Sequence, residues 1–197
     1  HGVARVPAGF YHFTGMVSPL RNAASLAEIE QYPIYDGTEW DDSDAAQDVA
    51  AARREGATPV YHVGHMYESA WQIRGYEQFL LDTIERPAWA ECLLERLYVG
   101  NRARAEAAAR AGVDEVYCGD DVANQNATMF HPDTWRRLIH SRWAKLWRGV
   151  KDVREQTAIG YHSDGNVSAI VGDLVDAGLD VLNPVQPECM DLDALHA

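Results

Sequence analysis

The sequence predicts a parallel α/β protein in which helices return the chain repeatedly to one sheet. Segments with strand and helix patterns alternate over most of the 197 residues. The segment Ala111-Gly112-Val113-Asp114 recurs in kind as Ala177-Gly178-Leu179-Asp180, and in each copy a glycine ends a helix before an apolar residue and an acid lead into a strand. Polar residues follow four of the predicted strands, as in (β/α) barrels. We therefore expect an incomplete (β/α)8 TIM barrel, with an open flavodoxin-like sheet as the competing fold.

The first 44 residues are expected to form an N-terminal irregular segment with one short helix, and residues 45–197 the partial barrel. His1 to Ser18 is rich in glycine, proline and aromatic residues, which favours a loop or an irregular hairpin. The capping-box pattern Ser25-Leu26-Ala27-Glu28 predicts a helix to about Gln31. An acidic linker, residues 41–44, precedes the partial barrel.

Short apolar runs predict the strands of the barrel region, over residues 58–63, 113–118, 158–161 and 180–182. Helical spacing of apolar residues predicts the helices, over residues 45–55, 67–84, 87–111, 131–153 and 167–177, with a last one starting over 191–196. A full barrel of this class needs about 250 residues. We therefore expect the C-terminal strands of the barrel to lie beyond Ala197.

Composition and charge exclude several classes of function. Hydrophobic residues make up 47% and charged residues 24% of an ordinary globular composition. No apolar run approaches the roughly 18 residues of a membrane span, and no signal peptide is visible. The net charge of −13 argues against nucleic acid and anionic membranes as partners. Three cysteines without zinc-finger spacing indicate reduced thiols in a cytoplasmic protein.

The four polar strand ends supply the candidate functional residues. They are His65 with Glu68, Asp120 with Asp121, His162 with Asp164, and Asn183 with Gln186. Because parallel strands place their carboxyl ends at one edge, these side chains are expected to line one site.

His162 and Asp164 are the most informative pair. They are two residues apart in the run Tyr161-His162-Ser163-Asp164-Gly165-Asn166, so on an extended chain they point the same way. Imidazole and carboxylate are normal zinc ligands, and a catalytic zinc usually has three protein ligands. The third would then come from beyond Ala197. The alternative is that Asp164 or Asn166 caps the following helix while His162 is only hydrogen-bonded.

The remaining candidates each have a structural alternative. Asp120 and Asp121 face opposite ways on an extended chain, so at most one is expected to enter the site, where paired carboxylates can produce a proton donor. Arg74 could bind a carboxylate through two hydrogen bonds, or lie on a solvated surface. Asn183 and Gln186 fit polar substrate contacts or a rigid turn around Pro184. Cys189 offers a thiol nucleophile or ligand, or an ordinary loop cysteine.

These strand ends, at these separations, resemble the motifs of the uroporphyrinogen decarboxylase superfamily. The resembling segments are Gly119-Asp120-Asp121, Tyr161-His162-Ser163-Asp164-Gly165, Asn183-Pro184-Val185-Gln186, Phe130-His131-Pro132-Asp133 and residues 67–75. The likeness runs over roughly Pro19 to Asp191. It implies a (β/α)8 barrel and one of two chemistries. Some members are cofactor-free tetrapyrrole decarboxylases, and others are zinc-dependent methyltransferases that act between corrinoid proteins, thiols and methylated substrates.

The sequence departs from both branches. The Arg-rich N-terminal signature of the decarboxylases is not seen, and Gly64 to Glu68 replaces their second motif. His162 and Asp164 match the His-x-Cys zinc pair of the methyltransferases, with Asp in place of Cys.

The resemblance implies an enzyme for metal-assisted methyl transfer or demethylation to a corrinoid or thiol acceptor. The alternatives are a cofactor-free uroporphyrinogen decarboxylase and a non-catalytic remnant that binds a partner. The expected roles are catalysis for Asp120, Asp121 and His162; substrate binding for His65, Glu68, Arg74, Asn183 and Gln186; and metal binding for His162 and Asp164. Zinc and a corrinoid are the expected cofactors, with none in the decarboxylase. The expected partners are a small-molecule substrate, a corrinoid protein and a second copy of the chain.

Overall fold

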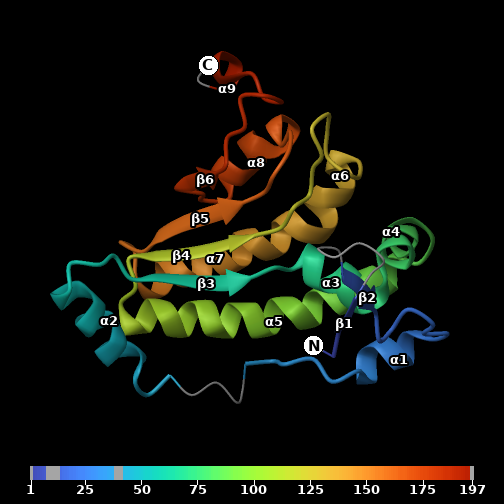
Figure 1. Cartoon of the computed structure of the whole chain (residues 1–197), viewed down its shortest axis with the longest axis horizontal. Coiled ribbons are helices and arrows are strands. Elements are labelled where there is room, and N and C mark those ends of the chain that lie inside the picture. The colour runs from blue at the N-terminus through green and yellow to red at the C-terminus, as the bar shows by residue number, and fades with distance from the viewer. Residues whose placement is uncertain (1, 8–13, 38–41, 196–197) are drawn as a thin grey trace.

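The computed structural model describes residues 2–7, 14–37 and 42–195, and its centre is a parallel sheet. The strands are β3 (Val60–Gly64), β4 (Glu115–Gly119), β5 (Ala158–His162) and β6 (Val181–Asn183). They lie in the order β3-β4-β5-β6, and every neighbouring pair is parallel. Figure 1 shows the strands stacked upward from β3 to β6, with helices between them in sequence. This is the predicted α/β fold, an incomplete (β/α) barrel.

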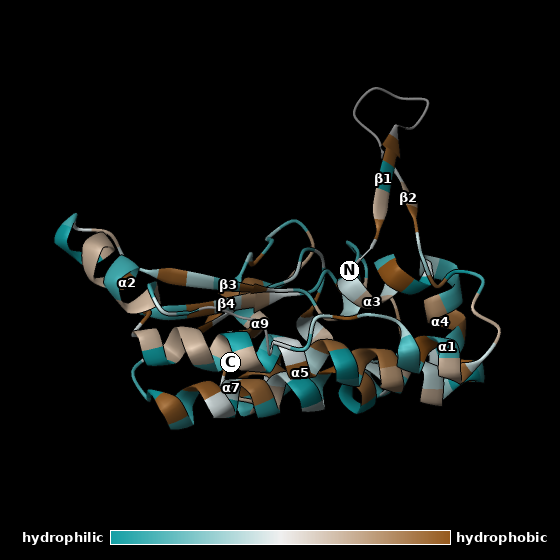
Figure 2. Ribbon diagram, turned by 90° about the horizontal axis from the view of Figure 1, so that it is seen from below, coloured by the Kyte–Doolittle hydropathy of each residue, from teal (hydrophilic) through white to brown (hydrophobic). Residues whose placement is uncertain are grey.

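Two long helices, α5 (Pro87–Ala111) and α7 (Ser141–Val153), lie against one face of this sheet. The other α-helices are α1 (Leu26–Gln31), α2 (Ala45–Arg54), α3 (Tyr67–Arg74), α4 (Tyr76–Glu85), α6 (Pro132–Trp135), α8 (Val171–Asp176) and α9 (Leu192–Leu195). Figure 2 shows α5 and α7 side by side beneath β3 and β4. None of the helices in the described part of the chain is long and apolar enough to cross a bilayer.

The N-terminal segment forms a hairpin of β1 (Ala4–Pro7) and β2 (Thr14–Val17), followed by α1. The expected cap of α1 is present, because Ser25 Oγ accepts a hydrogen bond from the Glu28 amide at 3.4 Å. Three parts of these predictions lie outside the described residues. They are the tip of the hairpin, residue 41 of the predicted acidic linker, and His196 at the end of the predicted final helix.

Two predicted helices differ from the structure. The pattern over 67–84 predicted a single helix, but the chain forms α3 and α4 with Gly75 between them at φ +93°. Glycine adopts this conformation without the steric cost that a β-carbon would bring. The predicted helix over 131–153 is likewise divided, because a π-helical turn, Arg136–His140, separates α6 from α7. Gly75 ends one helix and begins the next, whereas the residues that flank the π-helical turn keep right-handed helical angles, so that turn interrupts the hydrogen-bond pattern and not the helix.

An aromatic layer joins the sheet to α7. Trp143 and Trp147 are fully buried, and the Tyr161 ring meets both edge-on at centroid distances of 6.1 and 5.9 Å. Cys118, also fully buried, accepts a hydrogen bond from Trp147 Nε1 at 3.1 Å. Because side chains alternate along a strand, residues next to these buried ones point to the opposite, open face of the sheet.

Candidate functional site

The structure gathers the polar strand ends into two adjacent groups at the carboxyl ends of β3 to β6. The His65 cluster consists of His65, Glu68 and Asp120, and the His162 cluster consists of Asp121, His162 and Asp164. In each cluster one donor atom from every residue lies within 4.8 Å of the others. Asn183 contacts His162, and Gln186 contacts Gly165, the residue that follows Asp164. The polar residues at the strand ends therefore converge at one edge of the sheet, as expected.

Asp120 lies beneath the site and connects three elements. Its side chain is fully buried, and Oδ1 accepts hydrogen bonds from the amides of Met66 at 2.8 Å and Glu68 at 3.0 Å. Oδ2 accepts from Trp143 Nε1 at 3.2 Å. Met66, the N-cap residue of α3, supplies no side-chain cap of its own. Asp120 thus caps α3 from the end of β4 and ties that helix to α7.

Burial raises the pKa of Asp120 to about 7, while hydrogen bonds from the backbone of Glu68 and Tyr67 act in the opposite direction. The neighbouring Asp121 has the opposite placement, with its side chain 38% exposed in the His162 cluster. The structure therefore separates the adjacent aspartates into one that supports the site and one that faces it.

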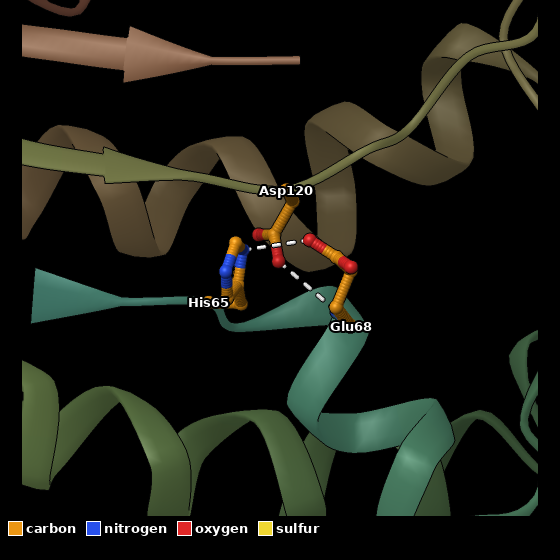
Figure 3. Close-up of side chains that lie close together, drawn as sticks. All are labelled: His65, Glu68 and Asp120. Carbon is orange, nitrogen blue, oxygen red and sulfur yellow. Dashed lines mark hydrogen bonds and ion pairs between the residues drawn. The ribbon is translucent and has the colours of Figure 1, made fainter. Parts of the chain in front are cut away.

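His65 and Glu68 form an ion pair beside Asp120, whose carboxylate lies between them in Figure 3. His65 Nδ1 lies 2.6 Å from Glu68 Oε2 and 2.9 Å from the Gly119 carbonyl oxygen. The hydrogen bond with Glu68 is the main cause that raises the pKa of His65 to about 9. Burial acts to raise the pKa of Glu68, but the hydrogen bond and charge of His65 lower it overall. The pair is therefore charged at neutral pH.

The His162 cluster is more open and is the candidate set of metal ligands. His162 Nε2 lies 3.5 Å from Asp121 Oδ1, and the same oxygen accepts a hydrogen bond from the Asp164 amide at 2.9 Å. Two carboxylates and one imidazole therefore converge from the ends of β4 and β5. Glu68 connects the two clusters, because its Oε2 accepts a hydrogen bond from the Asp121 amide at 3.3 Å.

The other nitrogen of His162 is held by two residues of the open sheet face. His162 Nδ1 lies 3.0 Å from Asn183 Oδ1 and 3.2 Å from the Tyr117 hydroxyl, and that hydroxyl donates to Asn183 Oδ1 at 2.7 Å. A proton on Nδ1 fits the acceptor oxygen of Asn183, and Nε2, which lies toward Asp121, is then the nitrogen available to a metal. Hydrogen bonding of this kind orients metal-binding histidines in known sites.

Tyr117 and His62 were not predicted as site residues. The His62 ring lies 5.6 Å from the His65 ring and 5.6 Å from the Tyr117 ring, centroid to centroid. Strand alternation in the sequence could have identified Tyr117. It stands between the core residues Val116 and Cys118, so its side chain must point to the other face of the sheet. His62 likewise precedes the buried Val63.

Arg74 is not in either cluster. It is 1% exposed and donates from Nε to Asp82 Oδ2 at 2.7 Å and from Nη1 to the Leu20 carbonyl at 2.5 Å. The alternative expectation of a solvated surface position is wrong, because the guanidinium ties α3 to α4 and to the segment before α1. The substrate-binding role predicted for Arg74 has no support in this placement.

Gly165 shapes the turn that carries Asp164. Its φ is +85°, and a β-carbon there would lie 2.6 Å from the Asn124 carbonyl oxygen. Its amide donates to Gln186 Oε1 at 2.6 Å, which places Gln186 at the base of the same turn. Tight backbone contact and a left-handed conformation together leave no room for a side chain.

Gly165→Ala is therefore expected to lower the free energy of unfolding by about 1–3 kcal/mol. Urea unfolding would measure the change. Gly172→Ala is the matched control, since nothing lies within 4 Å of the added carbon and alanine favours helix. Equal stability of Gly165→Ala and the parent would show that this turn is not constrained as described.

Comparisons with known proteins identify the family. The family profile described as Uroporphyrinogen decarboxylase (URO-D) matches residues 58–192, a span that contains both clusters. The chain belongs to the uroporphyrinogen decarboxylase family. Among solved structures, a methyltransferase from Methanosarcina mazei resembles this family member with a TM-score of 0.57 and 23% identity, over 70% of this chain. The match spans 40% of the methyltransferase chain. No match was found among curated proteins.

Proposed function

We propose that this uroporphyrinogen decarboxylase family member takes part in metal-assisted methyl transfer, from a methylated small molecule to a corrinoid or thiol acceptor. The observation that carries the proposal is the convergence of Asp121, His162 and Asp164 around one point at the strand ends. The resemblance in fold to a methyltransferase is in keeping with it.

The donor set fits a catalytic zinc ion. Zinc accepts imidazole nitrogen and carboxylate oxygen at about 2.0–2.2 Å, and its catalytic sites have three protein ligands and an open fourth position. The three donor atoms, within 4.8 Å of one another, need only a small closure to reach such distances. Asp121 would thus be the third ligand, and it lies within the described residues. The sequence predicted this ligand beyond Ala197. When bound, zinc would polarise the methyl donor or promote ionisation of a thiol acceptor.

The surrounding residues would prepare this site. Asn183 and Tyr117 hold His162 in the tautomer that presents Nε2. Gln186 holds the turn of Asp164 through the Gly165 amide. Asp120 fixes the start of α3, and so the place of Glu68. Polar atoms of the substrate would meet Glu68 and His65 beside the metal ligands.

The acidic side chains of the site favour this function over tetrapyrrole decarboxylation. A substrate with many carboxylates needs cationic partners, and Glu68, Asp121 and Asp164 place three carboxylates at the strand ends. Arg74, the cation that the sequence offered for this purpose, is buried against Asp82. Decarboxylation of uroporphyrinogen nevertheless remains the outcome to test directly.

Zinc binding by the full-length protein is the first test. We expect one zinc per chain, with His162→Ala and Asp164→Asn each weakening binding more than about 100-fold, because outer partners of zinc ligands alone contribute about 10–100-fold. Asn183→Ala is expected to lie in that 10–100-fold range. Calorimetric titration with zinc would measure these affinities, and Asp133→Asn, on an aspartate that is 73% exposed, is the control.

Turnover separates the remaining alternatives. Anisole, trimethylamine and dimethyl sulfide serve as methyl donors to cob(I)alamin, with the absorbance of methylcobalamin as readout. Zinc-dependent formation of methylcobalamin supports the proposal. Loss of carboxyl groups from uroporphyrinogen in zinc-free protein would establish the decarboxylase instead, and absence of both zinc binding and turnover would favour a non-catalytic role.

A further inference from the structure

We propose that His65 is the acid that protonates the leaving atom of the methyl donor, and that Glu68 positions it for this step. The inference rests on the proposed function, since it assigns a proton donor to the same site. It gives the His65 cluster a chemical role distinct from that of the metal ligands.

The contacts of the ring define which proton is available. His65 Nδ1 faces two oxygens, the Glu68 carboxylate at 2.6 Å and the Gly119 carbonyl at 2.9 Å. Both are acceptors, so Nδ1 carries a hydrogen that stays within the protein. The proton on Nε2 is then the one that the ring can give away. The side chain is 36% exposed, which allows exchange of this proton with solvent.

The position of the ring relates it to the metal ligands. Glu68 Oε2 contacts both His65 Nδ1 and the Asp121 amide, so one carboxylate fixes the acid beside the His162 cluster. Glu68 is itself held, because Asp120 accepts a hydrogen bond from its amide. The acid is therefore supported by α3 and β4, whereas the ligands come from the ends of β4 and β5.

The groups around His65 favour its charged form. Glu68 on α3 and Asp120 after β4 both raise its pKa, and burial opposes them without cancelling their effect. Burial and the charge of His65 lower the pKa of His62, which disfavours a second charged imidazole on β3. One charged imidazole thus stands at this corner of the site.

A metal in the His65 cluster would compete with more existing hydrogen bonds than one in the His162 cluster. Asp120 uses Oδ1 for two amides and Oδ2 for Trp143 Nε1. His65 Nδ1 and Glu68 Oε2 are paired with one another. A cation would have to replace these bonds.

The proton step balances as follows. The bond between the methyl carbon and its heteroatom breaks, and the methyl group forms a bond to the acceptor, a corrinoid Co(I) or a thiolate. The electron pair of the broken bond stays on the heteroatom. The heteroatom takes the proton from His65 Nε2, and the imidazole becomes neutral until solvent restores its proton.

The charge of His65 is tested by NMR titration of the histidine side chains in full-length protein, with and without zinc. We expect His65 to be half-titrated near pH 9. In Glu68→Gln the pKa of His65 should fall by at least about one unit, since an opposite charge at contact shifts a pKa by about 1–3 units. A raised folded-state pKa contributes stability below about pH 6.5 that is lost as pH rises through about 9. The stability difference between parent and Glu68→Gln should therefore close above that pH.

His65→Asn distinguishes the acid from a ligand. We expect this variant to bind one zinc with the parent's affinity and to transfer methyl groups at least about 100-fold more slowly, the lower range for loss of a general acid. The rate loss should be larger for substituted anisoles whose phenols are weaker acids. A neutral His65 at pH 7, weakened zinc binding in His65→Asn, or an equal rate loss across the anisoles overturns the inference. Absence of zinc binding or of methyl transfer in the parent protein instead overturns the proposed function.

Discussion

Asp120→Ala is expected to lower the free energy of unfolding by about 3–5 kcal/mol, because it leaves several buried donors without a partner. The carboxylate accepts hydrogen bonds from the Met66 amide, the Glu68 amide and Trp143 Nε1, and it is fully buried. Each buried donor left unsatisfied costs about 1–3 kcal/mol, and neighbouring effects add incompletely. Urea unfolding followed by tryptophan fluorescence would measure the loss.

Asp120→Asn separates the cap from the contact with Trp143. Its carbonyl oxygen can still accept from the two amides of α3, but its NH2 group would face the Trp143 N–H, donor against donor. An intermediate loss is expected. Asp121→Ala is the matched control, since the adjacent aspartate is 38% exposed and should change stability by no more than about 1 kcal/mol. Equal losses at the two positions would refute the supporting role of Asp120.

Arg74→Ala is the second substitution with a large expected effect, a loss of about 3–5 kcal/mol, as for other broken buried ion pairs. The guanidinium is buried and bonds Asp82, the Leu20 carbonyl and the Arg21 carbonyl. Its removal leaves a 1% exposed carboxylate without its closest partner. Thermal and urea unfolding would report the loss.

Arg86 provides the comparison for Arg74 on the same aspartate. Arg86 Nε lies 3.2 Å from Asp82 Oδ1, but its side chain is 39% exposed. Arg86→Ala should therefore lower stability by about 0–1 kcal/mol. Zinc affinity is expected to be unchanged in both variants, because Arg74 is outside both clusters. Weaker zinc or substrate binding by a folded Arg74→Ala protein would restore the predicted substrate-binding role.

Local patterns in the sequence were sufficient for most helices and strands. Ser25 caps α1 as the capping-box pattern predicted, and Gly112 ends α5 in the left-handed conformation. Such features depend on neighbours a few residues away, which the sequence contains. The prediction of one helix over residues 67–84 failed at Gly75. The apolar periodicity continues through this residue, but its φ of +93° breaks the helix.

The sequence predicted where the candidate site lies, but not which of its residues contact one another. Parallel strands put their carboxyl ends at one edge, so His65, Asp121 and His162 had to lie near one another. Alternation along the chain predicted that Asp120 and Asp121 would point apart. Which of them is buried depends on α7, because Trp143 lies over Asp120 and donates to it.

The sequence by itself determined the α/β order of the elements, the family motifs and the edge at which the candidate residues gather. Only the tertiary structure decided that Asp121 completes a three-donor set with His162 and Asp164, and that Tyr117 and Asn183 orient the imidazole. The physical reason is distance along the chain. Contacts between residues some 20 to 66 positions apart depend on strand register and helix packing, which no local pattern contains.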